Sequence, residues 1–237
     1  MSYLKEHVET SLLAADRWHS NIPNISDGND FVGQPLRIGG MSGRNQRHFF
    51  NNLCSMEDAR YLEIGLHSGS TFCSAMYGNK MKKCLGIDDW SQFVTNRDSR
   101  GTVRRTHRLF KDNFKKFKGE NCASFIESDC WELNPLDLGN FNIYFYDGDH
   151  QYESQFKGLD YFLPCLDKEF VFVVDDWNDN ANGVKEGTLD AISKNNLKTI
   201  YKKEIFTEMG NRPSKGGWRS KWHNGIGIFV LSKEGDA

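Results

Sequence analysis

One stretch constrains the fold of this chain more than any other: an apolar run at 61–64 that breaks abruptly into a Gly/Ser-rich turn at 65–69. The run favours a buried strand, and Ser70 and Thr71 are placed to cap a helix after the turn. In a doubly wound α/β sheet, a strand, a glycine turn and a helix in this order border the ligand crevice. Glycine in the turn lets the backbone approach a cofactor. His67 stands where a dinucleotide fingerprint has its middle glycine, so the turn fits a pyrophosphate poorly.

The rest of the chain alternates apolar runs with segments of helical periodicity, which is typical of an α/β fold. Further strands are predicted at 82–87, 123–127, 141–146, 170–174, 198–206 and 225–231. Helices are predicted at 3–18, 72–79, 97–118, 152–166 and 184–193, with a short one through Phe49, Phe50 and Leu53. We therefore expect one doubly wound sheet with helices on both faces, in a single large domain of the 237-residue chain.

The first 44 residues differ in character from the rest of the chain. An amphipathic helix at 3–18 leads into a loop at 21–43 that is rich in Gly, Pro, Asn and Ser. We expect residues 1–44 to pack on the core or to cover it as a lid, and residues 45–237 to form the main domain.

Composition excludes several classes of protein. A formal net charge of -2 with 26% charged residues argues against a nucleic-acid-binding protein and against an acidic disordered chain. The six cysteines form no Cys-x-x-Cys pair and no zinc-ligand spacing with the seven histidines, so they are expected to be reduced thiols. No apolar run approaches the ~20 residues of a membrane span, and the N-terminus lacks an apolar signal core. We expect a cytoplasmic protein.

Acidic side chains follow the predicted strands at their carboxyl ends. They are Glu63, Asp88, Asp129, Asp147, Asp149, Asp175 and Asp176. In an open parallel sheet these strand ends lie along one edge, so the acids are expected to line one crevice, with Asp88 placed to accept hydrogen bonds from ribose hydroxyls. Carboxylates this close raise one another's pKa unless a cation or hydroxyl ligands compensate. The pattern predicts a metal ion and a polyhydroxylated ligand.

Three of these acids are candidate metal ligands. Asp147, Asp175 and Asp176 follow adjacent strands and can supply three oxygen atoms to a hard divalent ion. The alternative is that the acids cap the helices that follow. Capping explains one acid per turn, but it does not explain Asp-Gly-Asp-His at 147–150 together with the pair at 175–176, so we favour the metal site.

Four segments carry a pattern shared with one enzyme class. They are residues 61–71, 86–88, 146–153 and 174–176. Together they resemble the class I S-adenosylmethionine-dependent methyltransferases, and within these the metal-dependent small-molecule O-methyltransferases of the macrolide-sugar, aminocoumarin and catechol types. The resemblance covers about residues 40–232, and the Asp-Gly-Asp-His-x-Tyr-Glu segment is its most specific part. It implies a Rossmann-like sheet of seven strands in the order 3-2-1-4-5-7-6 with the last strand antiparallel.

The resemblance also implies roles for individual residues. The ligands of Mg2+ or another divalent cation are then Asp147, Asp175 and Asp176, and the general base falls on Asp149 or His150. The residues expected at S-adenosylmethionine are Glu63, Gly65, His67, Ser68, Gly69, Ser70, Thr71, Asp88, Asp89, Trp90, Ser128, Asp129, Cys130 and Asp147, with the 128–130 turn beside the adenine. The activity implied is methyl transfer to a hydroxyl of a small molecule, such as a sugar or a natural-product intermediate.

The sequence leaves alternatives open. An NAD-dependent oxidoreductase shares the first crevice, an RNA or nucleotide methyltransferase would use the basic helix at 97–118, and a catalytically silent relative would only bind the cofactor. The missing pyrophosphate glycines disfavour the oxidoreductase, and the net charge disfavours nucleic acid as a partner. The acceptor pocket is expected to involve Trp177, Asn178 and the 207–224 loop, with Met209, Arg212, Trp218, Arg219, Trp222 and His223. The same loop can instead form a contact between the subunits of a homo-oligomer.

Overall fold

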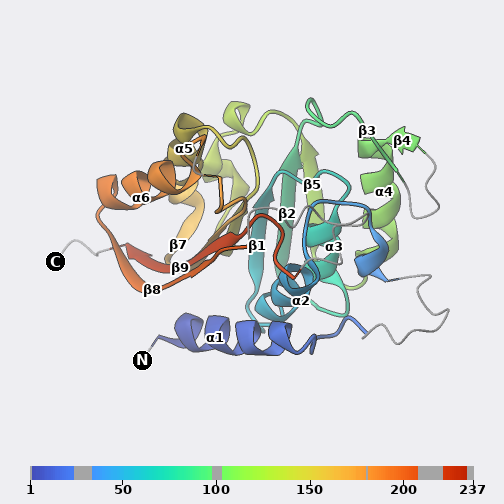
Figure 1. The fold of residues 1–237 in the computed structure, drawn as a ribbon, viewed down its shortest axis with the longest axis horizontal. Coiled ribbons are helices and arrows are strands. Elements are labelled where there is room, and N and C mark those ends of the chain that lie inside the picture. Colours follow the sequence, from blue (N-terminus) through green and yellow to red (C-terminus); the bar gives the residue numbers. More distant parts are fainter. Residues whose placement is uncertain (1, 24–33, 98–102, 180, 208–220, 234–237) are drawn as a thin grey trace.

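The computed structural model describes residues 2–23, 34–97, 103–179, 181–207 and 221–233. Its longer helices are α1 (Tyr3–Asp16), α2 (Arg44–Leu53), α3 (Ser70–Met76), α4 (Thr106–Phe117), α5 (Tyr152–Phe162) and α6 (Val184–Lys194). Its strands are β1 (Arg60–Ile64), β2 (Lys83–Asp88), β3 (Thr95–Arg97), β4 (Val103–Arg105), β5 (Ala123–Glu127), β6 (Phe141–Tyr146), β7 (Leu166–Val174), β8 (Leu197–Ile205) and β9 (Ile226–Lys233). Figure 1 shows their arrangement.

Seven of these strands form one sheet in the order β5-β2-β1-β6-β7-β9-β8. The pairs from β5 to β7 are parallel, whereas β9 pairs antiparallel with both β7 and β8. This confirms the predicted order 3-2-1-4-5-7-6 and the antiparallel last strand. Because β1 and β6 lie side by side, the turns after them meet at the centre of the sheet edge.

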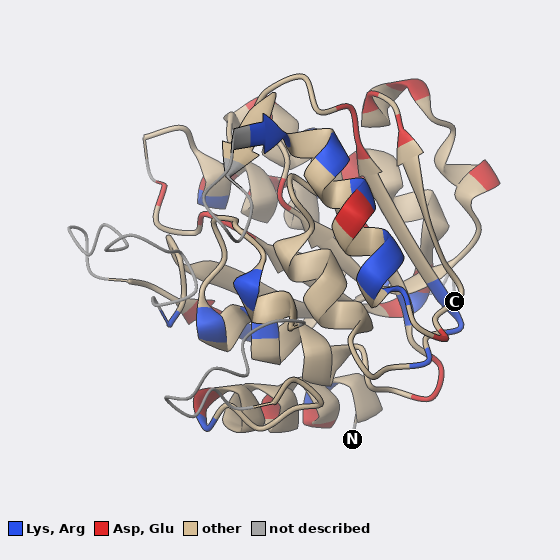
Figure 2. Ribbon diagram, turned by 90° about the vertical axis from the view of Figure 1, so that its right-hand side faces the viewer, with Lys and Arg blue, Asp and Glu red and all other residues tan. Residues whose placement is uncertain are grey.

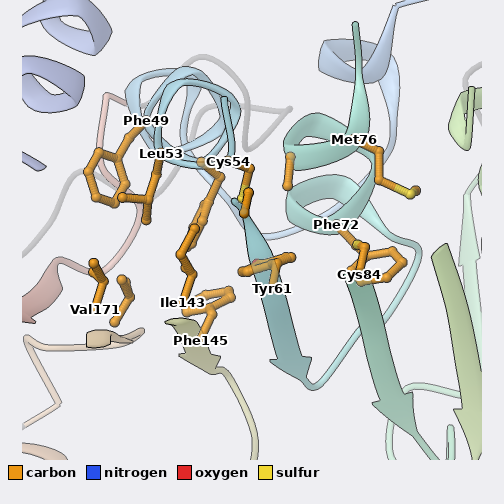
Figure 3. Close-up of a cluster of buried hydrophobic side chains, with 14 of the residues drawn as sticks. Phe49, Leu53, Cys54, Tyr61, Phe72, Met76, Cys84, Ile143, Phe145 and Val171 are labelled. Atoms are coloured by element: carbon orange, nitrogen blue, oxygen red, sulfur yellow. The ribbon is translucent and has the colours of Figure 1, made fainter. Parts of the chain in front are cut away.

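The central strands of the sheet are buried on both faces, and alternate residues of each serve different cores. In β6, Ile143 and Phe145 join a cluster with side chains of α1, α2 and α3, while Tyr144 and Tyr146 join a second cluster with α5 and α6. Figure 3 shows part of the first cluster around Phe145. Because its side chains alternate between two buried faces, this strand is apolar or aromatic at every position except Asn142.

The basic stretch at 97–118 differs from its prediction as one helix. Thr95–Arg97 and Val103–Arg105 pair as a small antiparallel sheet, and α4 begins only at Thr106. The reason is that the apolar side chains of a helical underside start at Leu109 and Phe110, which are buried. Figure 2 marks both basic and acidic positions on the ribbon of the side of the molecule that carries α4.

Two further boundaries were wrong. The helix predicted at 152–166 ends at Phe162, because Pro164 follows in a short 3-10 turn at Leu163–Cys165, and β7 then begins earlier than expected, at Leu166. Ser70 and Thr71 do not cap α3; the capping position is Gly69, whose φ of 83° is left-handed. Within the described residues, no helix is long and apolar enough to cross a membrane.

Candidate active site

A cleft of about 510 Å³ opens at the carboxyl ends of β1, β2, β6 and β7. The predicted site residues on its wall are Gly65, His67, Asp88, Asp89, Trp90, Ser128, Asp129, Cys130, Asp147, Asp149, His150, Asp175 and Asp176. The others, which are Glu63, Ser68, Gly69, Ser70 and Thr71, do not line it. We call the part around the 65–69 turn and Asp88 the turn end. The part around Asp147, His150, Asp175 and Asp176 is the acid end.

The turn end is held together by backbone hydrogen bonds to one carboxylate. Asp88 Oδ2 accepts from the N–H groups of Leu66 at 2.7 Å and His67 at 2.8 Å, and Asp88 Oδ1 accepts from the N–H of Trp90 at 2.6 Å. A carboxylate has about four acceptor positions, so these bonds leave room for a ligand hydroxyl. The predicted contact of Asp88 with a ribose stays a prediction.

Glu63 lies behind this turn. It is fully buried and accepts hydrogen bonds from the hydroxyls of Tyr61 and Thr71, both at 2.5 Å. Burial raises the pKa of Glu63 to about 8, although the two hydroxyl donors act in the opposite direction. The structure thus places Glu63 and Thr71 as internal supports of the strand and helix. Ser70 also does not line the cleft, and its hydroxyl pairs with that of Ser42 at 2.8 Å.

The turn end and the acid end touch at Gly65. This residue has φ +88°, and a Cβ built on it would lie 1.9 Å from the backbone oxygen of Asp147. Only glycine permits this approach, which explains the residue at the end of β1. The two loops are therefore fixed against each other by backbone contact.

The cleft wall holds several strained backbone positions. Of the six non-glycine residues with positive φ in the described part of the chain, four line the cleft: His67, Trp90, Asp176 and Asn224. Such conformations cost about 1–3 kcal/mol each and cluster at functional sites, where the surroundings enforce them. The strain here occurs at both ends of the cleft.

At the acid end, potential ligand atoms of Asp147, His150 and Asp176 lie within 4.8 Å of one another. His150 Nε2 is 2.8 Å from Asp176 Oδ2, and the amide of Asn224 donates to Asp176 Oδ1 at 2.6 Å. Of the two predicted bases, His150 thus points into the cluster. Asp149 is exposed and accepts a hydrogen bond from Ser154 at 2.6 Å.

Asp175 is placed differently from its predicted partners. It is 5% exposed, lines the cleft, and accepts a hydrogen bond at Oδ1 from the amide of Gln46 at 2.9 Å. The close group therefore contains His150 in addition to Asp147 and Asp176, with Asp175 beside it. Sequence reasoning missed Gln46, because this residue lies on a helix far from the acidic motifs.

The acids differ in how well their charges are compensated. Burial, and then the neighbouring acids, raise the pKa of Asp147 and of Asp175 well above the usual range. Burial also acts to raise the pKa of Asp176, but the hydrogen bond and charge of His150 outweigh it and lower that pKa. The hydrogen bond to Asp176 raises the pKa of His150. Two of the three acids thus lack a compensating cation from the protein.

The described residues that were expected at the acceptor pocket divide between the cleft wall and the packed edge of the sheet. Trp177 is fully buried and donates to Glu204 at 3.0 Å, and Asn178 bonds the backbone of Thr207, so neither lines the cleft. Both serve packing at the sheet edge. His223 does line the cleft, whereas Trp222 is buried against Phe49. Met209, Arg212, Trp218 and Arg219 lie outside the described residues.

Comparison with known proteins gives a match to one protein family. Residues 62–177 match the sequence model of a family described as a methyltransferase domain. This stretch of the chain is therefore similar to a methyltransferase domain, and the sheet that carries it has the strand order expected for the class I S-adenosylmethionine-dependent methyltransferases. The oxidoreductase alternative is thereby set aside, and the methyltransferase match begins in β1 and ends just after the acidic pair that follows β7.

Individual relatives are distant. The uncharacterized protein R132 of Acanthamoeba polyphaga mimivirus is 28% identical over 142 residues, which are 56% of this chain and 59% of that protein, so the match spans less than two thirds of its length. A putative S-adenosylmethionine-dependent methyltransferase from Streptococcus mutans aligns with TM-score 0.51 and 11% identity, covering 79% of this chain and 48% of that one. Cofactor-bound Rv0187 from MTB aligns with TM-score 0.50 and 14% identity, covering 97% and 91%. These two structures share the fold.

Proposed function

We propose that the protein is an O-methyltransferase that transfers the methyl group of S-adenosylmethionine to a hydroxyl of a small molecule, with the help of a divalent cation such as Mg2+. One observation carries the proposal: a single cleft of about 510 Å³ joins the glycine turn to a cluster of acids and a histidine. This volume is in the range of small-molecule sites.

The turn end suits the methyl donor. Asp88 and Asp89 offer acceptors for hydroxyl groups, and Trp90, Phe93 and Trp131 add aromatic surface to the wall. S-adenosylmethionine supplies a methyl group on a positively charged sulfonium, and an acid-lined cleft favours that charge.

The acid end suits a divalent cation. Carboxylate oxygens are the preferred ligands of Mg2+, and the donor set here is Asp147 and Asp176, with either Asp175 or His150 as a third ligand. The raised pKa values of Asp147 and Asp175 support this assignment, because a bound cation would compensate charges that the protein leaves unpaired. When bound, such an ion lowers the pKa of a hydroxyl that contacts it.

The proton of the acceptor hydroxyl needs a base. His150 lines the cleft, and its contact with Asp176 orients the imidazole as an acid–histidine pair does in general base catalysis. His150 can take up the proton at Nδ1 while its Nε2–H donates to Asp176, and Asp176 and Asp179 then stabilise the imidazolium that forms. Asp149 is the second candidate, and its exposed carboxylate is tied to Ser154. If His150 instead binds the cation, the base is Asp149.

A binding experiment tests the proposal first. Calorimetry of the purified protein with S-adenosylmethionine, S-adenosylhomocysteine and NAD, each with and without Mg2+, should show binding of the first two ligands only. Methyl transfer from labelled S-adenosylmethionine to a panel of sugars and catechols should then depend on the cation and stop with a chelator. A full rate in chelator-treated protein would remove the cation from the proposal. Binding of NAD alone would remove the methyltransferase activity.

Nucleic acid is not part of the proposal. On α4 and β4 the basic side chains are partly offset by acids, since Arg104 pairs with Asp112 at 3.3 Å and Lys111 lies 3.8 Å from Glu127. We expect no salt-dependent RNA or DNA affinity in a filter-binding assay. Tight binding that weakens steeply with salt would instead favour an RNA acceptor.

A further inference from the structure

A residue from outside the family match reaches the acid end. Gln46 lies on α2, before the matched residues 62–177, and is fully buried. Its amide nitrogen donates to Asp175 Oδ1 at 2.9 Å, and its amide oxygen accepts from the N–H of Gly43 at 3.1 Å. Both ends of the amide are therefore bonded, so the side chain cannot turn without losing a hydrogen bond.

The start of α2 is itself fixed from two sides. Arg47 is buried; its Nε bonds Ser42 Oγ at 2.9 Å, and its Nη1 bonds the carbonyls of Pro35, Leu36 and Ile38 at 3.0–3.2 Å. On the other side, the N–H of Asn45 donates to the carbonyl of Lys221 at 2.9 Å, and a Cβ on Gly43 would lie 2.4 Å from that oxygen. These contacts hold the Gln46 amide at a defined place relative to the sheet.

The Asp175 carboxylate is the group whose position the Gln46 amide fixes. Asp175 is 5% exposed at the end of β7 and lies beside the group formed by Asp147, His150 and Asp176. Gln46 is the only side chain in the described residues that donates a hydrogen bond to its carboxylate. The backbone N–H of Asp176 also bonds this carboxylate, so the orientation of Asp175 is set by the Gln46 amide and the chain that follows β7.

We propose that Gln46 is a positioning residue for the cation site, and that its amide fixes the Asp175 carboxylate beside Asp147 and Asp176. The inference rests on the proposed function, since it concerns the cation in that proposal. Gln46 itself contacts neither the cation nor the acceptor; it acts through Asp175.

The test measures cation binding directly, with Mn2+ followed by calorimetry and by its paramagnetic resonance signal. Gln46→Met removes the donor at similar volume and should weaken Mn2+ binding at least tenfold, while affinity for S-adenosylhomocysteine stays within threefold. Asn51→Leu is the matched control: this buried amide on the same helix donates to the carbonyls of Ser74 and Tyr77, both at 2.7 Å, away from the cleft. It should lower stability and leave Mn2+ binding unchanged.

A double-mutant cycle separates positioning from general loosening of the fold. In an Asp175→Asn background, Gln46→Met should cost no further Mn2+ affinity, because both changes act on the same carboxylate. If Gln46→Met does not fold, Gln46→Asn keeps an amide but shortens the side chain by one methylene, so it cannot bond both Gly43 and Asp175, and the same loss is expected.

The outcomes distinguish the two proposals. Unchanged Mn2+ affinity in the folded Gln46 variants overturns the role of Gln46 and leaves the proposed function standing. An equal loss in Asn51→Leu, or a full additional loss in the Asp175→Asn background, also overturns it. A parent protein that binds S-adenosylhomocysteine but no divalent cation overturns both the cation in the proposed function and the role of Gln46.

Discussion

At the turn end of the cleft, one carboxylate satisfies three backbone N–H groups that lie within 25 residues of it, whereas at the acid end the contacts join segments far apart in the chain. Gln46 reaches Asp175 across 129 positions, and Asn224 reaches Asp176 across 48. The turn end is also closed by its own hydrogen bonds, while the acid end keeps two carboxyls with raised pKa. The difference places the carboxyls whose charge the protein leaves uncompensated at the acid end of the cleft.

The largest effect is expected where the two ends touch. In Gly65→Ala the new Cβ meets the Asp147 carbonyl at 1.9 Å and the residue keeps a left-handed φ, so the free energy of unfolding should fall by about 3 kcal/mol or more. Urea denaturation measures it. Gly119→Ala is the control, because its φ is +54° but its nearest neighbour lies 3.9 Å away; it should cost about 1 kcal/mol. Equal costs would show that the contact does not fix the loops.

The next prediction compares two acids within the acid end. Asp147→Asn and Asp176→Asn should each reduce methyl transfer at least 100-fold while S-adenosylhomocysteine affinity stays within threefold. Their effects on the cation-free fold should be opposite at pH 7. Removing the uncompensated charge of Asp147 should stabilise it by about 1 kcal/mol, and removing the partner of His150 should cost a similar amount. Thermal unfolding with and without Mg2+ measures both.

The parent should also gain thermal stability from Mg2+, and each variant should lose that gain. Asp149→Asn serves as a control for the fold, since its carboxylate is exposed. If the two variants changed stability in the same direction, the difference in charge compensation inferred from the geometry would be wrong.

A smaller effect concerns the support behind the turn end. The pKa of Glu63 is raised to about 8 from an ordinary value of 4.5, so the folded state holds the proton more tightly than the unfolded state. Its contribution to stability is therefore fully present below about pH 4.5 and is lost as the pH rises toward 8. Glu63→Gln should reduce the fall in stability between pH 5 and pH 8 by at least about 1 kcal/mol. Identical slopes in urea denaturation at pH 5, 6.5 and 8 would contradict this.

Local patterns explain why the sheet and the turn could be predicted from sequence. The strand at 61–64, its glycine and the acids after each strand are contiguous, and the rule for parallel strands brings their ends together. The pairing at 95–105 was missed because the chain there has basic residues in place of an apolar pattern of either period. The features that were predicted each depend on residues close together in the sequence.

The acid end could be predicted only in part, since its geometry depends on distant segments. The sequence identified Asp147, Asp175 and Asp176, but it did not show that Gln46 holds one of them or that His150 contacts another. It also named Glu63 as a cofactor contact without showing that Tyr61 and Thr71 bond its carboxylate. Hydrogen bonds between side chains of distant segments leave no periodic signal.

The smallest expected effect decides what Asp88 does for a ligand. Asp88→Asn keeps one acceptor oxygen, so the turn loses part of its three N–H bonds, and affinity for S-adenosylhomocysteine should fall about fivefold, which is ~1 kcal/mol. That loss alone does not separate a ribose contact from a distorted turn.

The two explanations are separated by repeating the titration with 2′-deoxy and 3′-deoxy analogues of S-adenosylhomocysteine. If Asp88 accepts a ribose hydroxyl, one analogue should bind the parent more weakly and bind Asp88→Asn with little further loss, because the partner is already gone. Independent losses for both analogues would mean that Asp88 bonds only the backbone of the turn. All hydrogen bonds of its carboxylate would then lie within the protein.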